Sequence, residues 1–158
     1  MKTTFRSLLF LAFATVATGS TLYAQSHTVT LHVDLDQLNQ GNPSAACTLS
    51  ADPSTEVIGD DSPESFTIVV SEGDDIEWEA VGSDGEEIDI ENVEFMTPAG
   101  KEKPFRKDKL EGNRGNSGKK KVKDKVKNNT KGNTYKYNIE FIVNDEHFIV
   151  DPKVKVRA

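Results

Sequence analysis

The chain has 158 residues, with 19 Lys and Arg against 26 Asp and Glu, so its formal net charge is −7. This length excludes a large multidomain protein once any leader is removed, and the single cysteine excludes an intrachain disulfide framework. Stability must therefore come from an apolar core or from a bound ion.

The first 24 residues have the three parts of a secretory signal peptide. Lys2 and Arg6 form a positive head, residues 8–17 form an apolar stretch, and Ala24 is a small residue at a suitable cut. A membrane anchor needs roughly 20 apolar residues, and the polar residues 18–21 interrupt this run too early. We expect cleavage before Gln25, no transmembrane segment afterwards, and a secreted or periplasmic location.

Charge is unevenly distributed along the predicted mature domain, residues 25–158. Residues 25–100 hold 18 Asp and Glu and no Lys or Arg, whereas residues 101–131 hold 13 Lys and Arg and only 4 acids. Loss of the signal leaves 17 basic and 26 acidic residues, a net charge of −9. The mature chain is an acidic body with a basic insert.

Alternation of apolar and polar residues predicts β-strands along most of the acidic body. Turn-forming residues separate them, and a change of phase near Asn92 suggests a bulge. In chain order the predicted strands cover residues 27–35, 47–49, 56–58, 66–70, 76–81, 88–90 and 93–95.

The basic insert, residues 97–134, is the least regular part of the chain. Thr97 to Gly118 is polar and rich in Gly, Pro and Asn, which predicts a long surface loop. Val122 and Val126 are four residues apart, which fits a helix face as well as a strand face. The turn residues 128–133 favour a hairpin.

Three further strands are predicted after the insert. Residues 135–143 contain the longest series of alternating apolar side chains that we expect to face the core. Residues 147–150 form the next strand after a turn. Pro152 breaks the pairing, and residues 153–157 form a charged strand that we expect at a sheet edge. Seven to nine short strands predict an all-β fold, a small antiparallel β-sandwich of immunoglobulin-like or cupredoxin-like type, with a small closed barrel as the alternative.

Two local patterns resemble known families. Residues 70–78, Val-Ser-Glu-Gly-Asp-Asp-Ile-Glu-Trp, resemble the hairpin of cupredoxin-like sandwiches, which implies that Trp78 packs between sheets. Copper binding in that family needs a Cys–His–Met group near the C-terminus. Because Met96 and His147 follow Trp78 without a cysteine, the resemblance implies no copper.

The second resemblance joins three separated pieces. An early strand ending in Val33-Asp34, the Gly73-Asp74 turn, and an aromatic strand leading to Asp-Pro-Lys-Val-Lys-Val at 151–156 look like the AidA/PixA inclusion-body protein family. That family implies a bacterial, β-rich protein without a known catalytic site. The signal peptide and the basic insert depart from the family, and it offers no functional residues to carry over.

No motif in the chain predicts catalysis or a defined metal site. The mature histidines are His27, His32 and His147, and no nucleophile-elbow, zinc-protease or phosphate-loop motif is present. Acidic pairs near turns could take calcium, which accepts irregular oxygen ligands, yet no ligand set can be assigned. The simpler interpretation is a solvated acidic surface. Cys47 is expected to be a buried, inert thiol rather than an intermolecular disulfide.

The candidate binding residues are the lysines of the basic insert, which attract phosphate or sulfate polymers. They are Lys119, Lys120, Lys121, Lys123, Lys125 and Lys127. No aromatic residue interleaves them, so specific nucleic acid is not indicated. Anionic polysaccharide or lipopolysaccharide is one partner, and the acidic body of the same chain or of a neighbouring copy is another. We expect a non-catalytic protein for binding or assembly. The alternatives are a salt-sensitive self-associating structural protein, and a hydrolase of cell-surface polymer that would use His147 or a carboxylate pair lining a cleft.

Overall fold

The computed structural model describes residues 24–115 and 118–158. The predicted signal peptide, except Ala24, lies outside these residues. Within them the chain forms twelve strands and one short 3₁₀ helix, η1 (Pro43–Ala46), and no α-helix. The predicted all-β class is confirmed.

The strands closely follow the alternating segments of the sequence. They are β1 (Ser26–Val33), β2 (Cys47–Ala51), β3 (Glu56–Ile58), β4 (Thr67–Val70), β5 (Asp75–Gly82), β6 (Glu87–Met96), β7 (Lys109–Glu111), β8 (Asn113–Arg114), β9 (Lys120–Lys125), β10 (Thr134–Val143), β11 (Glu146–Val150) and β12 (Lys153–Val156).

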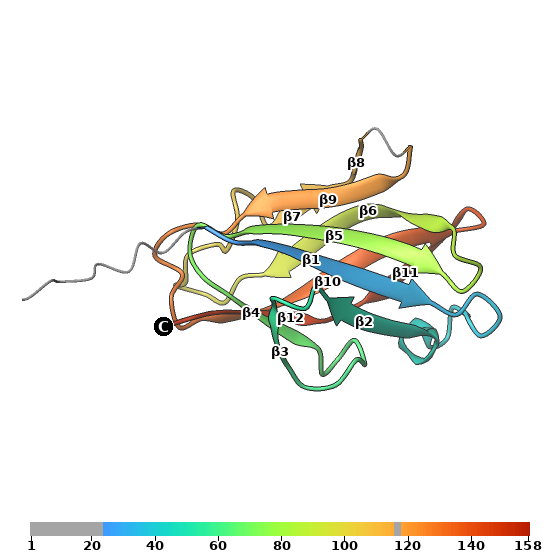
Figure 1. Ribbon diagram of the computed structural model, residues 1–158, viewed down its shortest axis with the longest axis horizontal. Helices are drawn as coiled ribbons and strands as arrows, with labels where there is room; N and C mark the ends of the chain where they lie inside the picture. The colour runs from blue at the N-terminus through green and yellow to red at the C-terminus, as the bar shows by residue number, and fades with distance from the viewer. Residues whose placement is uncertain (1–23, 116–117) are drawn as a thin grey trace, which may run out of the picture.

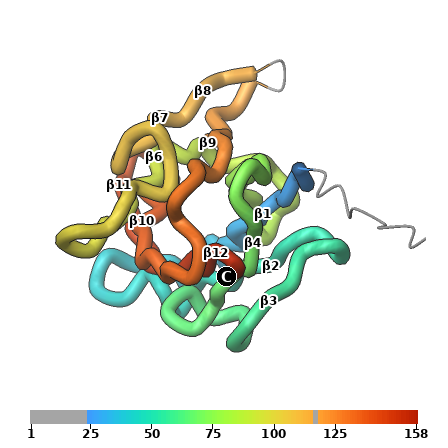
Figure 2. The backbone as a smooth tube through the Cα atoms, turned by 90° about the vertical axis from the view of Figure 1, so that its left-hand side faces the viewer, coloured from blue at the N-terminus to red at the C-terminus, as the bar shows by residue number. Residues whose placement is uncertain are grey.

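The strands form one mixed, strongly curved sheet that is nearly closed (Figures 1 and 2). Its main path runs β2-β1-β5-β6-β10-β12-β4-β3, while β11 pairs with β10, β7 with β6, and β9 with both β5 and β8. The predicted purely antiparallel arrangement is wrong, because β1 pairs with β5 and β12 with β4 in parallel. In each parallel pair the connecting chain crosses back over the molecule after the first strand. The two strands of the pair therefore begin at the same end of the sheet.

The aromatic core joins strands from distant parts of the sequence. Trp78 of β5 is fully buried and packs edge-on against Phe95 of β6 and Tyr137 of β10, with ring centroids 5.9 and 5.8 Å apart. Its indole N–H donates a 3.2 Å hydrogen bond to the Tyr137 hydroxyl, which satisfies both buried polar groups. The buried position that the cupredoxin resemblance implied for Trp78 is therefore present. However, β4 and β5 are not paired with each other, so residues 70–78 form an arch rather than a hairpin.

The predicted bulge in β6 is confirmed. Asn92 pairs with Glu140 and Ile90 with Phe141, so that Glu91 is the extra residue. Both Asn92 and Val93 are consequently buried.

Two other predictions about the C-terminal half are wrong. Strand β12 is not at a sheet edge but lies between β10 and β4, with Val154 and Val156 fully buried. The segment Thr97–Gly118 is not only a surface loop, since it contributes β7, β8 and the fully buried ring of Phe105, which packs 5.6 Å from Trp78.

Candidate functional site

The basic strand β9 lies along the acidic strand β5 in antiparallel register. Asp75 is opposite Lys125, and Glu77 is opposite Lys123. Because side chains alternate across a sheet, the outward face carries acids on β5 directly beside lysines on β9. Part of the basic insert is therefore a strand of the same sheet as the acidic body, and its lysines lie beside acidic side chains.

Four of the six candidate lysines form ion pairs with carboxylates of the same chain. Lys121 lies 2.6 Å from Glu79 and 3.1 Å from Glu87, and Lys125 lies 2.9 Å from Asp75. The remaining two pairs are Lys120 with Glu91, and Lys127 with Glu102. The hydrogen bond to Glu79, assisted by that to Glu87, raises the pKa of Lys121.

Lys119, Lys123 and Lys125 are the exposed members of the set, and of these Lys119 and Lys123 form no ion pair among the described residues. The structure therefore does not present the six lysines as one free basic arm. Removing residues 119–127 would also remove strand β9 with its buried Val122, so single charge substitutions are the better probe of binding.

An excess of positive charge gathers at one end of the strands. There the loops 98–108 and 126–133 contact each other, since the Lys127 N–H donates to the Pro104 carbonyl over 2.9 Å. These loops carry six basic residues against Glu102 and Asp108. The basic residues are Lys101, Lys103, Arg106, Lys107, Lys127 and Lys131. We call this surface the basic end.

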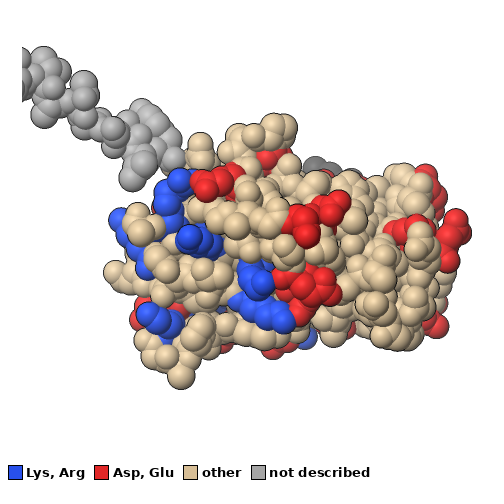
Figure 3. Space-filling view, turned by 90° about the horizontal axis from the view of Figure 1, so that it is seen from below, with Lys and Arg blue, Asp and Glu red and all other residues tan. Residues whose placement is uncertain are grey.

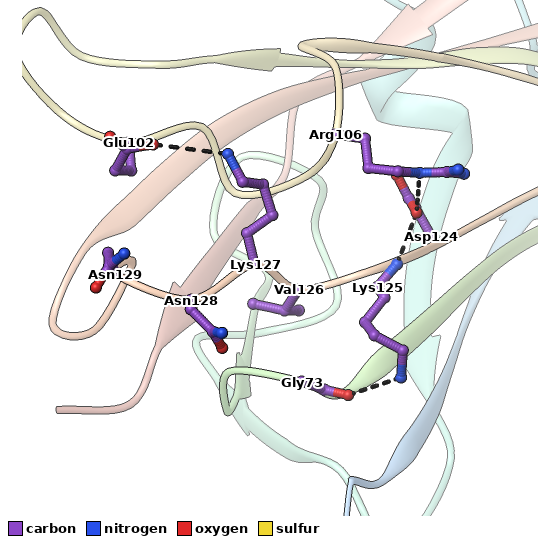
Figure 4. A pocket seen from close by; sticks show the side chains of 9 residues that line it. All are labelled: Gly73, Glu102, Arg106, Asp124, Lys125, Val126, Lys127, Asn128 and Asn129. Atoms are coloured by element: carbon purple, nitrogen blue, oxygen red, sulfur yellow. Dashed lines mark hydrogen bonds and ion pairs between the residues drawn. The ribbon is translucent and has the colours of Figure 1, made fainter.

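The basic end contains an open pocket of about 620 Å³ (Figure 4). Most of its charged groups are already engaged. The Arg106 Nε donates to the buried Asp124 carboxylate at 3.1 Å, and the Lys125 Nζ donates to the Gly73 carbonyl at 3.0 Å. Figure 4 shows Lys127 reaching toward Glu102 on another side of the pocket. The positive and negative groups that line the pocket therefore nearly balance. The net positive charge of the basic end comes from the exposed lysines around the pocket.

Acidic residues gather at the opposite end. The loop after β1 contacts the β5–β6 turn, because the Ser83 N–H donates to the Val33 carbonyl, and it contacts the β10–β11 turn through Gln40 and Glu146. Loops 34–46, 83–86 and 144–146 contain no Lys or Arg. Six carboxylates lie there, and none forms an ion pair with Lys or Arg among the described residues. They are Asp34, Asp36, Asp84, Glu86, Asp145 and Glu146. We call this surface the acidic end.

Figure 3 views one long side of the molecule and shows the same separation of charge. The visible Lys and Arg side chains gather toward the end with the C-terminus, with a few Asp and Glu side chains among them, and the opposite end shows Asp and Glu side chains without Lys or Arg. The sequence hinted at this separation through its two charge blocks. It could not show that acids from three distant loops converge on one end.

A second pocket, of about 410 Å³, lies beside the acidic end and is lined in part by His32, Asp34 and Cys47. Cys47 is buried, as predicted, and burial raises the pKa of its thiol to about 12. Such a thiol carries almost no thiolate near neutral pH, so it is a poor nucleophile and a poor metal ligand.

The three histidines occupy separate environments. His27 is buried against Asp74, His32 contacts Ser50 at 2.8 Å, and His147 contacts Glu140 at 2.7 Å on the surface. His147, one of the two kinds of group that the hydrolase alternative could use, lines neither of the two pockets. Within residues 24–115 and 118–158, no group of three or more His, Cys, Asp or Glu side chains is arranged to hold a metal ion. Calcium thus gains no ligand set there. In the same part of the chain, no helix is long and apolar enough to cross a membrane.

Comparison with known proteins places the fold. No protein-family model matches the chain, and no curated protein matches it in sequence. Among solved structures, the inclusion body protein PixA from Burkholderia cenocepacia J2315 is similar, with a TM-score of 0.60 and 12% sequence identity. The match covers 87% of this chain and 99% of that one. The predicted resemblance to the AidA/PixA family is therefore confirmed at the level of the fold.

Proposed function

We propose that this is a secreted or periplasmic, non-catalytic β protein whose copies associate end to end through their oppositely charged ends. The observation that carries the proposal is the separation of the acidic end from the basic end along the strands. Contacts between two different surfaces of one chain are heterologous, and they give rings or filaments according to whether the rotation closes. The fold supports a role in assembly, since the similar solved protein is described as an inclusion body protein.

We also infer that the curved sheet behaves as a two-layer sandwich, the finer arrangement predicted from the sequence. Contacts across the core between Trp78 of β5 and Tyr137 of β10 support two facing layers. Such a body is stiff along its strands because interiors are closely packed. It would hold the two charged ends apart and keep their loops in place.

The first test measures association by light scattering at low and high salt. Screening shortens the range of electrostatic attraction to about 8 Å at physiological ionic strength. We expect assemblies at low salt that dissociate as salt is added. A strict monomer at both salts rejects end-to-end association.

Charge reversal at each end sharpens this test. Lys101→Glu with Lys107→Glu changes the basic end, and Asp36→Lys with Glu86→Lys changes the acidic end. All four side chains are exposed, and none forms an ion pair among the described residues, so the fold should be retained. We expect each double variant alone to be monomeric. When the two variants are mixed, we expect heterodimers but nothing larger. One variant keeps its acidic end and the other keeps its basic end, so each molecule has a single surface that can associate.

An anionic polysaccharide or lipopolysaccharide is the competing partner for the basic end. In that case the wild-type chain stays monomeric but binds immobilised heparin in a salt-dependent way. The Lys101→Glu, Lys107→Glu variant loses this binding, whereas the Asp36→Lys, Glu86→Lys variant keeps it. The same two proteins therefore separate the self-associating form of the proposal from an external partner.

A further inference from the structure

The start of β1 is held by a buried carboxylate. Asp74, in the arch between β4 and β5, is only 3% exposed. It accepts hydrogen bonds from the Gln25 backbone nitrogen at 2.8 Å, the Ser71 backbone nitrogen at 2.7 Å and the His27 Nε2 at 3.1 Å. A carboxylate in such a place is stable only when donors surround it.

His27 connects Asp74 to a second carboxylate. Its Nδ1 lies 2.7 Å from the Thr55 hydroxyl, which itself lies 2.8 Å from Asp52. Because the single Thr55 hydroxyl hydrogen is directed to Asp52, the Thr55 oxygen is free to accept from Nδ1. The His27 ring thus links Asp74 to the Thr55–Asp52 pair.

Gln25 is the residue at which this network meets the predicted signal cleavage. Its carbonyl accepts the Asp75 N–H at 2.8 Å, and β1 begins at the next residue. Ala24 is exposed. In the uncleaved chain, the nitrogen facing Asp74 is a neutral amide. After cleavage between Ala24 and Gln25, the same nitrogen is an α-ammonium group.

We propose that Asp74 is the receptor for the α-ammonium group of the mature chain, so that signal removal completes an ion pair at the start of β1. This inference rests on the export that the proposed function assumes. Charge-assisted hydrogen bonds are roughly twice as strong as neutral ones. Processing therefore strengthens the link between β1 and the β4–β5 arch. Cleavage before or after this bond would move the charge away from Asp74.

The experiment begins with the exported protein and the intact mass of its mature form, which we expect to start at Gln25 with a free amine. Its stability to denaturant is compared with that of a chain carrying Gly-Ser-Ala before Gln25. We expect the folding equilibrium constant of the extended chain to be about tenfold lower, because its Gln25 nitrogen stays a neutral amide. In an Asp74→Asn background the difference between the two chains should disappear.

A second measurement covers the case in which Asp74→Asn does not fold. The α-amine of the mature chain is labelled with a succinimidyl ester at neutral pH and compared with the free peptide of residues 25–30. A carboxylate-bound ammonium is a poor nucleophile, so labelling should be about tenfold slower in the protein than expected for an ordinary α-amine. Gln25→Ala is the matched control, because it keeps the α-amine but cannot cyclise.

Three outcomes overturn the proposal: equal stability of the two chains, equal labelling rates, or a mature chain whose Gln25 nitrogen has attacked its own side-chain amide and released ammonia. These differ from failure of the proposed function. A chain retained in the cytosol with an intact leader rejects export itself. A correctly processed but monomeric chain rejects association and leaves the ion pair with Asp74 in place.

Discussion

At the residue scale, chemistry follows the local environment more than the residue type. Cys47 and Asp52 show this in opposite ways. Burial makes the Cys47 thiol inert. Although partial burial acts to raise it, donors from Ser54, Thr28 and Thr55 hold the pKa of Asp52 down at about 2. Asp52 thus stabilises the turn after β2 as an anion that accepts several hydrogen bonds.

This environment makes the contribution of Asp52 pH-dependent. The pKa of an unfolded Asp is about 3.9, so the folded pKa is lower than the unfolded one. Its stabilisation is fully present above the unfolded pKa and is lost as pH falls through about 2. In urea unfolding, the free energy of unfolding of the wild-type chain should fall as the pH is lowered from about 5 to about 2. We expect this fall to be smaller in Asp52→Asn. Ser54→Ala, which removes one donor, should have a smaller effect. An equal fall in all three proteins would contradict this.

At the element scale, β9 shows how a strand that looks like a binding arm becomes structural. Its lysines face acids on β5 in register, and its apolar side chain Val122 enters the core. Cross-strand pairs of opposite charge stabilise a sheet, whereas like charges facing each other destabilise it. β5 alone would be strongly acidic on its outer face, so β9 stabilises it by neutralising that face.

Lys121 is the strongest test of this pairing because it contacts two carboxylates and is about three-quarters buried. Lys121→Met keeps the apolar stem and leaves Glu79 and Glu87 uncompensated. We expect it to lower the free energy of unfolding by about 1 kcal/mol at low salt, with less loss at high salt. Lys123→Met is the matched control, since Lys123 is exposed and has no ion pair among the described residues; its effect should stay within about 0.5 kcal/mol. Equal losses in denaturant unfolding would show that charge pairing does not matter.

At the scale of the whole molecule, the sheet depends on its last strand. β12 fills the space between β10 and β4, so the end of the chain joins segments that begin near residue 67 and near residue 134. Val154 and Val156 are fully buried there. The curved body, and with it the distance between the two charged ends, therefore depends on residues 153–156.

Truncation tests this dependence. A chain ending at Pro152 leaves β10 and β4 with unpaired backbone groups and opens the core beneath them. We expect it to lack a cooperative unfolding transition by circular dichroism, because unsatisfied buried backbone groups cost several kcal/mol in total. A chain that lacks only the exposed Ala158 should unfold like the full chain. A folded, cooperative chain ending at Pro152 would show that β12 is dispensable.

The sequence by itself determined the β class, the positions of most strands, the bulge near Asn92 and the burial of Cys47. These features depend on alternation and local composition, which neighbouring residues encode. Only the tertiary structure decided that β1 and β5 are parallel, that β12 is an inner strand, that Phe105 enters the core and that most candidate lysines are paired with acids. These outcomes depend on which distant segments meet. The alternation of apolar and polar residues in a strand specifies which face is buried, but not which strand lies beside it. The neighbouring strand determines which carboxylate a lysine contacts.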